Sequence, residues 1–473
     1  MNIIGRKKEQ QILQDCLDSN KSEFLVVYGR RRVGKTFMIK EFFDNRFSFY
    51  ATGVENVNMK NELSFFYDSL IEYGSADKSP IKTWREAFSR LKSLLKNDSV
   101  ARDPLSGKRI IFLDELPWMD TPRSDFKPSL DHFWNSYASA EKDIVLIVCG
   151  SATSWIIGNI LTDRGGFYNR ITRQIHLMPF TLGECERFFM ANELKISRED
   201  IVSAYMIFGG IPYYLGLFSR RMSLAQNVDA LVFDESGPLH YEYKRLFNSL
   251  FKNSEKHYQI IETLAKRRSG LMRTEIINDT GIADGTLLTK ALSELEQCGF
   301  IRKYINFAKS KTCAYFQIID PFVLFSITFT ENKKLSSWTK YIRTPSYNSW
   351  SGLAYELVCL NHVDKIKNAL GISGVESSEY AWRSEHSSPG AQIDLLIDRM
   401  DNVINICEMK HTTNNFEITK EYRASLERKL DVFQNETKTK KALHLTMICS
   451  NGLKHEGLDS IVVNEIDGDE LFD

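Results

Sequence analysis

The sequence predicts a multidomain α/β protein whose first part contains a buried parallel sheet. At 473 residues the chain is too long for a single hydrophobic core, and its length corresponds to about three or four domains. Three apolar runs, at 24–28, 110–113 and 144–149, are continuous rather than alternating, which is typical of strands buried on both faces. Residues 62–73 and 84–95 carry apolar side chains at helical spacing, so we expect helices with a buried face there.

The overall composition limits the kinds of partner. Lysine plus arginine and aspartate plus glutamate each number 61, so any contact with nucleic acid has to be local. The 8 cysteines are spread through the chain without a CxxC pair, and we expect them to be reduced and mostly buried. The N-terminus has no signal-peptide core, and no apolar run approaches the ~20 residues of a membrane helix. We therefore expect a cytoplasmic protein without a membrane segment.

A glycine-rich loop between the first apolar run and a helix-like segment is the most informative motif. Its residues are Gly29, Arg30, Arg31, Arg32, Val33, Gly34, Lys35 and Thr36. The glycines let successive backbone N–H groups point at phosphate oxygens, and the following helix adds its positive N-terminal end. In such a loop Lys35 reaches the β- and γ-phosphates and Thr36 holds Mg²⁺. The motif predicts an ATP site, and the alternative is a plain glycine turn that happens to contain a lysine.

Acidic and hydroxyl side chains follow the other two apolar runs. Asp114 and Glu115 end the second run, and Ser151 follows the third. Because ligands gather at the carboxyl ends of parallel strands, we expect these groups beside the phosphate loop. Asp114 is then placed to bind Mg²⁺, Glu115 to orient or deprotonate the attacking water, and Ser151 to contact the γ-phosphate or its water. The alternative for the two acids is a solvated loop.

Two arginines, Arg170 and Arg173, alternate with apolar residues in the segment 169–177. One of them, with Arg170 as the candidate, could act as an arginine finger that stabilises charge on the transferred phosphate. An equally good interpretation is that both are surface cations beside a strand. Helical stretches are expected at 184–192 and 198–208, before a Gly-Gly-Ile-Pro interruption.

These motifs, in this order, resemble the archaeal-type P-loop ATPases, which are relatives of the AAA+ and STAND switch proteins. The resemblance rests on GRRRVGKT, FLDELPW, CGS, NRITRQIHLMPF and GGIPYYL, and it covers roughly the first half of the chain. It implies ATP hydrolysis, a helical lid that follows the nucleotide core, and Gly210 and Pro212 near the nucleotide. It leaves the oligomeric state open, with a homo-oligomer of the AAA+ kind as one possibility. The lid departs from the family pattern because it lacks a second sensor arginine.

From residue 256 the pattern changes to three short helices and a pair of strands. We expect helices at 258–265, 273–280 and 284–298 and strands at 300–305 and 314–319. This arrangement resembles a winged helix, which implies DNA binding. The third helix is a poor phosphate contact because Lys290 stands among acids. The wing offers Arg302, Lys303, Lys309 and Lys311, and the alternative is a role in packing or protein contacts.

The C-terminal part begins with a polar stretch at 332–350, which we interpret as a linker. A helix is expected from Gly352. Two alternating apolar segments follow, at 392–398 and 403–410, around a turn at 400–402. We expect these segments to form a β-hairpin.

Charged residues of this hairpin form a second candidate site. A hairpin that pivots at Asp401 places Asp394 directly opposite Glu408, and Lys410 on the same face. Facing carboxylates repel, so a divalent metal would stabilise the pair. A metal beside a lysine also provides what phosphodiester hydrolysis needs, which is an activated water and a positive group.

This part of the chain resembles the restriction-endonuclease-like PD-(D/E)xK superfamily, through Asp394, Glu408, Lys410 and Glu356 on the preceding helix. The resemblance implies that Asp394 and Glu408 bind Mg²⁺ or Mn²⁺. It implies that Lys410 is the catalytic lysine and that Glu356 is an auxiliary acid at the metal. An Ala-Gln pair at 391–392 replaces the Pro-Asp of the motif. Archaeal-type ATPases with such a domain form a recognisable group, and this chain is similar to them over nearly its whole length.

Together these interpretations predict a P-loop core, a helical lid, a winged helix and a nuclease-like α/β domain. The expected bounds are 1–178, 179–250, 251–330 and 331–473. The leading function is an ATP-dependent switch whose nucleotide state positions the nuclease-like domain on DNA. Two alternatives stay open. Either the C-terminal domain is a non-cleaving DNA- or protein-docking module, or the whole chain is a regulator whose ATPase cycle changes a partner complex.

Overall fold

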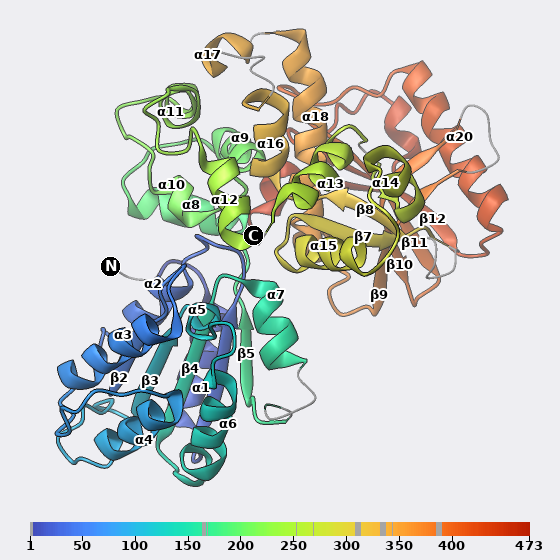
Figure 1. Ribbon diagram of the computed structural model, residues 1–473. Coiled ribbons are helices and arrows are strands. Elements are labelled where there is room, and N and C mark those ends of the chain that lie inside the picture. The colour runs from blue at the N-terminus through green and yellow to red at the C-terminus, as the bar shows by residue number, and fades with distance from the viewer. Residues whose placement is uncertain are drawn as a thin grey trace. The chain divides into compact units, whose positions relative to one another are not determined.

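The computed structural model describes residues 3–162, 167, 169–251, 253–267, 269–307, 314–331, 337–342, 344–384 and 390–473 (Figure 1). The chain divides into two compact units, Met1–Met178 and Pro179–Asp473. The described cysteines are buried, as the sequence predicted. None of the helices in this described part combines the length and the apolar character needed to span a lipid bilayer.

The first unit is built on a five-stranded sheet. Its strands are β1 (Glu23–Tyr28), β2 (Phe49–Thr52), β3 (Arg109–Asp114), β4 (Ile144–Gly150) and β5 (Arg173–His176). Their order across the sheet is β2-β3-β4-β1-β5, and every neighbouring pair is parallel. This confirms the parallel core predicted from the continuous apolar runs. All strands therefore end at one edge of the sheet, where the glycine-rich loop leaves β1.

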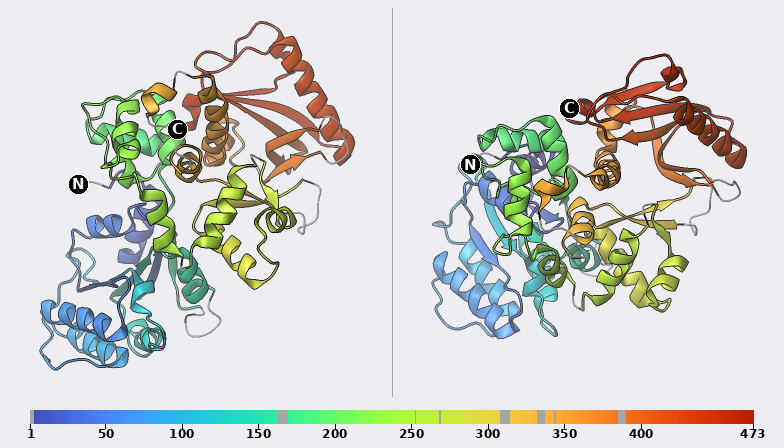
Figure 2. Two further views of the ribbon diagram at one scale, coloured as in Figure 1. Left: turned by 45° about the horizontal axis from the view of Figure 1, so that its top comes forward. Right: turned by 90° about the horizontal axis from the view of Figure 1, so that it is seen from above.

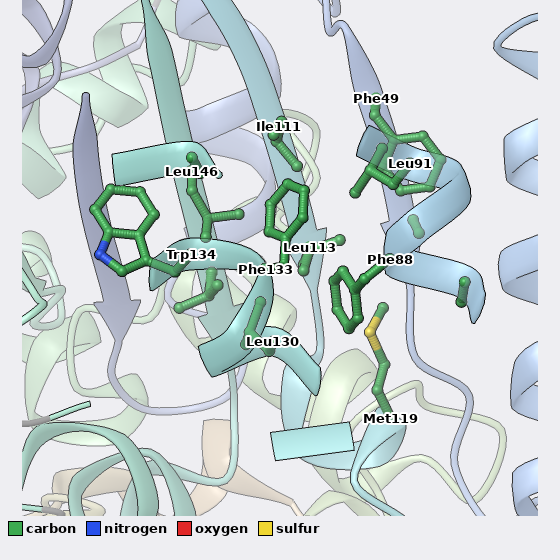
Figure 3. Packing of buried hydrophobic residues seen from close by; sticks show 14 of the residues in the cluster. Phe49, Phe88, Leu91, Ile111, Leu113, Met119, Leu130, Phe133, Trp134 and Leu146 are labelled. Atoms are coloured by element: carbon green, nitrogen blue, oxygen red, sulfur yellow. The ribbon is translucent and has the colours of Figure 1, made fainter. Parts of the chain in front are cut away.

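Helices of the first unit bury their apolar faces against this sheet. They are α1 (Lys7–Asp18), α2 (Lys35–Phe42), α3 (Met59–Glu72), α4 (Trp84–Leu95), α5 (Leu116–Met119), α6 (Phe126–Ser136) and α7 (Thr153–Ile156). Figure 3 shows Phe88 and Leu91 of α4 and Phe133 of α6 packed with Ile111 and Leu113 of β3. Each such side chain stabilises the fold by about 1.5–3 kcal/mol when fully buried. This core fixes the position of β3 and of the acids at its end.

The second unit begins with helices. They are α8 (Leu182–Ala191), α9 (Arg198–Phe208), α10 (Pro212–Leu215), α11 (Leu224–Val228) and α12 (Glu242–Leu250), and later α16 (Pro321–Phe329), α17 (Trp338–Tyr341), α18 (Pro345–Leu360) and α19 (Val363–Ala369). Both α16 and α18 pack on α9.

The linker predicted at 332–350 is wrong over its second half. The helix α18 begins at Pro345, because proline has no N–H to lose at the first helical position and its φ suits a helix. The rings of Trp338 and Trp350 pack against each other, with centroids 5.2 Å apart. Residues 332–336 and 343 of this stretch lie outside the described residues.

In the sequence, three helices and the three strands of a small sheet lie between α12 and α16. The elements are α13 (Glu255–Ala265), β6 (Leu271–Met272), α14 (Arg273–Thr280), α15 (Thr286–Gln297), β7 (Ile301–Ile305) and β8 (Ala314–Ile318). The strands are antiparallel in the order β6-β8-β7. The predicted helices and strand pair are present, and β6 adds a third strand. Lys309 and Lys311, which the sequence analysis assigned to the wing, lie outside the described residues.

The C-terminal part contains a five-stranded mixed sheet. Its elements are β9 (Ser377–Arg383), β10 (Gln392–Arg399), β11 (Val403–Lys410), α20 (Lys420–Thr437), β12 (Ala442–Cys449) and β13 (Asn464–Asp467). The order is β13-β12-β11-β10-β9, with β9, β10 and β11 antiparallel and β11, β12 and β13 parallel. Figure 2 shows the helix α20 lying along this sheet. Leu426 and Phe433 of α20 belong to one buried core with Ile404 and Ile406 of β11.

The end of β7 is joined to the edge of this mixed sheet. Asn306 is only 2% exposed, and its side chain donates to Arg383 O at 3.3 Å and accepts from Arg383 N at 3.1 Å. Phe307 N donates to Ala381 O at 3.0 Å. The Phe307 ring lies 5.4 Å from that of Phe433. The small sheet and the mixed sheet are therefore held together by hydrogen bonds and by a shared core.

Candidate functional site

The phosphate loop predicted from the sequence joins β1 to α2. Its backbone favours glycine, because φ is 143° at Gly29 and 92° at Gly34. A Cβ at Gly29 would also lie 2.3 Å from Leu177 O, whereas at Gly34 it would meet nothing within 4 Å. The loop therefore needs glycine at one position for space and conformation, and at the other for conformation alone. The rest of the loop consists of Arg30, Arg31, Arg32 and Val33, of which Arg30 and Val33 are buried.

The Lys35 side chain lies inside this loop. It is 5% exposed, and its Nζ donates to Gly29 O at 2.9 Å and to Arg30 O at 3.0 Å. These carbonyl acceptors carry no formal charge, so they do not neutralise the ammonium. Gly34 precedes the first turn of α2 and has no side chain that could cap its N–H groups. A phosphate at this place fits, because it would satisfy both the ammonium and the helix N-terminus.

Thr36 and Asp114 connect the loop to the end of β3. Thr36 Oγ1 donates to Asp114 Oδ2 at 2.8 Å, and Glu115 N donates to Asp114 Oδ1 at 2.9 Å. Asp114 is 3% exposed, and burial together with the nearby Glu115 charge raises its pKa. Mg²⁺ prefers oxygen ligands and is commonly held by one or two protein groups plus phosphates and water. The hydroxyl and the carboxylate therefore fit a magnesium ion that accompanies a nucleotide.

The Glu115 carboxylate is held from the neighbouring strand β4. Ser151 Oγ donates to Glu115 Oε1 at 2.6 Å, and Ser151 N donates to Oε2 at 3.1 Å. Glu115 has a φ of 45°, which is uncommon for a residue with a side chain and turns the chain away from the strand. The sequence analysis placed both residues at this edge but missed their pairing. The available signal was that a hydroxyl and an acid end two apolar strands.

Two further residues were predicted for this site, Arg170, which was considered together with Arg173, and Pro212. Arg173 begins β5 opposite Leu25 and pairs with Asp15 at 3.3 Å. Arg170 is exposed. Because it precedes β5, it lies toward the amino-terminal edge of the sheet, whereas the phosphate loop follows the carboxyl end of β1. An arginine finger at Arg170 would therefore have to act on another copy of the chain. Pro212 begins α10 in the second unit.

A family model described as an ATPase domain predominantly from Archaea matches residues 3–218. These residues form an archaeal-type ATPase domain. An uncharacterized protein of Methanocaldococcus jannaschii is 28% identical over 333 residues, which is 68% of this chain and 67% of that protein. An uncharacterized ATP-binding protein of the same organism is 44% identical over 44 residues, 9% of this chain and 75% of that protein. A Walker-type ATPase of Pyrococcus abyssi has a similar fold, with a TM-score of 0.51 and 18% identity over 69% of this chain and 96% of that one.

Beyond the ATPase domain, the C-terminal hairpin has the register expected from its sequence. Strands β10 and β11 are antiparallel, and Leu395 faces Cys407. This register is the one expected for a pivot at Asp401, and Asp394 and Glu408 are the next residues beyond this pair. The Glu408 charge raises the pKa of Asp394, which is consistent with two neighbouring acids at this end of the hairpin.

Three donors surround the Glu408 carboxylate. Lys429 Nζ of α20 donates to Oε2 at 2.5 Å, and the Tyr422 hydroxyl donates to Oε1 at 2.9 Å. Lys410 Nζ lies 3.3 Å from Oε1. Burial alone raises the pKa of Glu408, but the Lys429 and Lys410 ammoniums hold it below its ordinary value. The sequence analysis named a divalent metal as the cation that would stabilise this pair, and in the structure Lys429 supplies a cation to Glu408.

Lys429 and Tyr422 were missed by the sequence analysis. They lie about two helical turns apart on α20, so the sequence does place them on one helix face. What the sequence does not show is that α20 covers the sheet face that carries Glu408. This depends on the path of the chain after β11.

Asp394 has a different set of partners. Gln392 Nε2 donates to Asp394 Oδ1 at 2.5 Å, and an Arg302 nitrogen donates to Asp394 O at 3.2 Å. Arg302 Nε also donates to Gln317 Oε1 at 2.8 Å, and burial lowers the Arg302 pKa. The sequence analysis assigned Arg302 to phosphate contacts on the wing, which is wrong because this guanidinium is engaged by the neighbouring sheets. Lys303 is exposed, and its contact with phosphate stays a prediction.

The predicted set of three acidic metal ligands is not assembled. Among the described residues, no group of three or more His, Cys, Asp or Glu side chains is placed to hold a metal ion. Glu356, on α18, therefore does not join Asp394 and Glu408. Two carboxylates can still hold Mg²⁺ when water and phosphate supply the other ligands. An ion bound by Glu408 Oε2 has to replace the Lys429 ammonium there.

Proposed function

We propose that this protein is an ATP-hydrolysing switch that controls the action of its C-terminal unit on DNA. The observation that carries this proposal is the chain of contacts at the phosphate loop, where Thr36 bonds to Asp114 and Ser151 bonds to Glu115. The archaeal-type ATPase domain supports ATP as the ligand. The short relative that is named ATP-binding supports it further.

Each residue of the loop site has a task in this proposal. Lys35 moves from its carbonyl partners to the terminal phosphates, where its charge is needed. Thr36 and Asp114 hold Mg²⁺, which supplies charge neutralisation when it is bound. Glu115, oriented by Ser151, aligns the attacking water and accepts its proton. The N–H groups at the start of α2 stabilise the charge that develops on phosphate.

ATP turnover by the full chain, measured with and without Mg²⁺, tests this part of the proposal. Mg²⁺-dependent turnover that Asp114→Asn reduces would support the assignment. Nucleotide binding without turnover would limit the protein to a binding switch. A chain that neither binds nor hydrolyses ATP would contradict the proposal.

Arg170 is assigned to the boundary between two copies of the chain. Its position toward the amino-terminal edge of the sheet leaves it too far around the domain to serve its own phosphate loop. Mixing Arg170→Ala with Lys35→Ala protein tests this role, because each variant supplies what the other lacks. Recovery of ATP turnover in the mixture supports a finger in trans. Absence of recovery in a proven mixed assembly rejects it.

For the C-terminal unit we propose metal-dependent cleavage of DNA at Asp394, Glu408 and Lys410. The facing acids would hold Mg²⁺ or Mn²⁺, and Lys410 would stabilise charge on the scissile phosphate. The three helices and small sheet that include Lys303 would act as a winged helix on the DNA backbone. Incubation with plasmid, linear and single-stranded DNA, under Mg²⁺ or Mn²⁺ and with or without ATP, tests this proposal.

A second candidate is a C-terminal module that docks DNA or protein without cutting it. The observation that favours it is the ion pair of Glu408 with Lys429, which balances the acid without a metal. This candidate predicts no cleavage under any of the conditions above. It also predicts that capture of DNA or of a protein partner by the full chain changes when ATP is added.

A further inference from the structure

The acidic hairpin contains its own cation. The Glu408 and Lys429 side chains are only 15% and 18% exposed, and Nζ lies 2.5 Å from Oε2. The second lysine, Lys410, is 31% exposed and lies farther away, at 3.3 Å from Oε1. A charge-assisted contact that is this short and this shielded from water is stronger than an exposed ion pair. Lys429 is therefore the principal counter-ion of Glu408.

The same ammonium also acts on the facing acid. Burial raises the pKa of Asp394 and the Glu408 charge raises it further, whereas the Lys429 ammonium acts in the opposite direction. Two carboxylates that face each other across a hairpin repel. The Lys429 ammonium, in contact with Glu408, offsets part of this repulsion. The site is thereby balanced by a side chain that comes from another element, α20.

A divalent cation needs the oxygen atoms that this ammonium occupies. Mg²⁺ and Mn²⁺ bind carboxylate oxygens directly, and a positive group next to those oxygens weakens the binding. The lysine head is carried on a flexible four-carbon stem, so it can leave Glu408 without moving the helix. Its departure would leave Glu408 with the Tyr422 hydroxyl and Lys410 on its other oxygen.

We propose that the Lys429 ammonium is the resident counter-ion of the Asp394–Glu408 pair and competes with Mg²⁺ or Mn²⁺ for the Glu408 carboxylate. This inference rests on the proposed function in one respect, which is that the acid pair is the cation site. It adds that the metal affinity of the site is set by a residue of α20. Binding of the metal and departure of the lysine are then a single exchange.

Calorimetric titration of the full chain with Mn²⁺, without nucleotide, tests the exchange. The relevant signal is the binding that Asp394→Ala removes, which separates it from any ion at the phosphate loop. Lys429→Met keeps the apolar stem but removes the charge, and we expect it to bind Mn²⁺ at least about ten-fold more tightly. The matched control is Lys420→Met, an exposed position on the same helix, where the affinity should stay unchanged.

The possible outcomes separate this inference from the proposed function. Asp394-dependent binding that is equally tight or weaker in Lys429→Met overturns the exchange and leaves the metal site in place. No Asp394-dependent binding in either protein overturns both the exchange and the proposed metal site. Tighter binding in Lys429→Met, but not in Lys420→Met, supports both.

Thermal unfolding without divalent ions gives an independent measurement. If Lys429 is the counter-ion, Lys429→Met lowers the Tm, and adding Glu408→Gln to it restores most of the loss because the unbalanced charge is gone. A second substitution that lowers the Tm further would overturn the counter-ion role. This measurement also shows whether Lys429→Met is folded before its metal affinity is compared.

Discussion

The two acidic sites of this molecule balance their charges in different ways. At the phosphate loop, the carboxylates accept hydrogen bonds from neutral hydroxyls, Thr36 on Asp114 and Ser151 on Glu115. The Lys35 ammonium donates to main-chain carbonyls instead. The cation and the acids thus have separate, uncharged partners. A phosphate that brings its own metal ion would supply an opposite charge to each.

At the hairpin, the acid and the cations neutralise each other. Glu408 accepts directly from Lys429 and lies close to Lys410. The comparison teaches that a pair of acids at a strand end does not by itself indicate a ligand. The partners of the nearby lysines are more informative, because they show whether the charge is already balanced.

Loss of Lys35 is expected to have the largest effect on ATP turnover and so to test this comparison most strongly. Lys35→Ala removes the loop cation that reaches the terminal phosphates, so ATP turnover should fall by about 1,000-fold. Turnover and nucleotide affinity of the purified variant provide the measurement. Lys40→Ala, farther along α2 where Lys40 lies over the Tyr50 ring, is the matched control and should keep turnover within about two-fold. Normal turnover in Lys35→Ala would show that this ammonium does not serve a phosphate. The proposed difference between the phosphate loop and the hairpin would then be lost.

Glu115→Gln should have the next largest effect. The amide can still accept from Ser151 but cannot take a proton from water, so turnover should fall by about 100-fold. Nucleotide affinity should stay within about two-fold, because Glu115 is not assigned to binding. A single-turnover assay with an equilibrium binding measurement separates the two quantities. If turnover is unchanged, the residue that activates water lies elsewhere.

The stability of the second unit should also fall at low pH, because it contains a buried histidine, His362, that is neutral in the folded protein. His362 is 2% exposed, accepts from Leu182 N at 2.9 Å and donates to Val358 O at 2.7 Å. Burial lowers its pKa to about 4, from an ordinary value of 6.5. The unfolded chain therefore binds a proton here that the folded chain does not, and stability is lost as the pH falls from about 6.5 toward 4. Between pH 7 and pH 5 this loss should be about 2 kcal/mol.

Urea unfolding of the full chain at both pH values measures this loss. His362→Gln should be less stable at pH 7 but should show a smaller difference between pH 7 and pH 5. Burial also lowers the pKa of His411 to about 4, so the double variant with His411→Gln provides the reference. An unchanged pH difference in His362→Gln would assign the acid sensitivity to other groups. Only the loss of stability between pH 7 and pH 5 that persists in the double variant can be assigned to the acidic hairpin.

Ser151→Ala should have the smallest effect. Ser151 orients Glu115 but carries no charge and takes no proton, so turnover should fall by about ten-fold with little change in nucleotide affinity. In the Glu115→Gln background the same change should add almost nothing, because the group that Ser151 orients is already inactive. Additive losses would show that Ser151 acts on the nucleotide itself, as the sequence analysis expected.

Local patterns predicted most of the ATPase domain. The helix predicted at 84–95 has those bounds, and the register of the C-terminal hairpin follows from its turn. The strand β2 was missed because a four-residue segment is too short to show a periodic pattern. The start of α18 was missed because the polar stretch at 332–350 was interpreted as a linker, although the proline within it, Pro345, is favourable at a first helical position.

The partners of the acids could not be predicted in the same way. The Ser151 contact with Glu115 requires β3 and β4 to be neighbours, and the Lys429 contact requires α20 to cover one face of the hairpin. Both depend on how distant segments pack, which the pattern within each segment does not contain. Candidate residues were therefore found more easily than the charges that balance them.

The joint between β7 and the mixed sheet has a consequence for how the protein avoids self-association. The strand β9 is at the edge of its sheet, and open edges pair readily with strands of other chains. In this molecule Asn306 and Phe307 occupy hydrogen-bonding groups of that edge at Ala381 and Arg383. A fragment that begins after β8 would lose this cover and expose the edge. Such a fragment should aggregate through β9, whereas in the full chain Asn306 and Phe307 cover part of that edge.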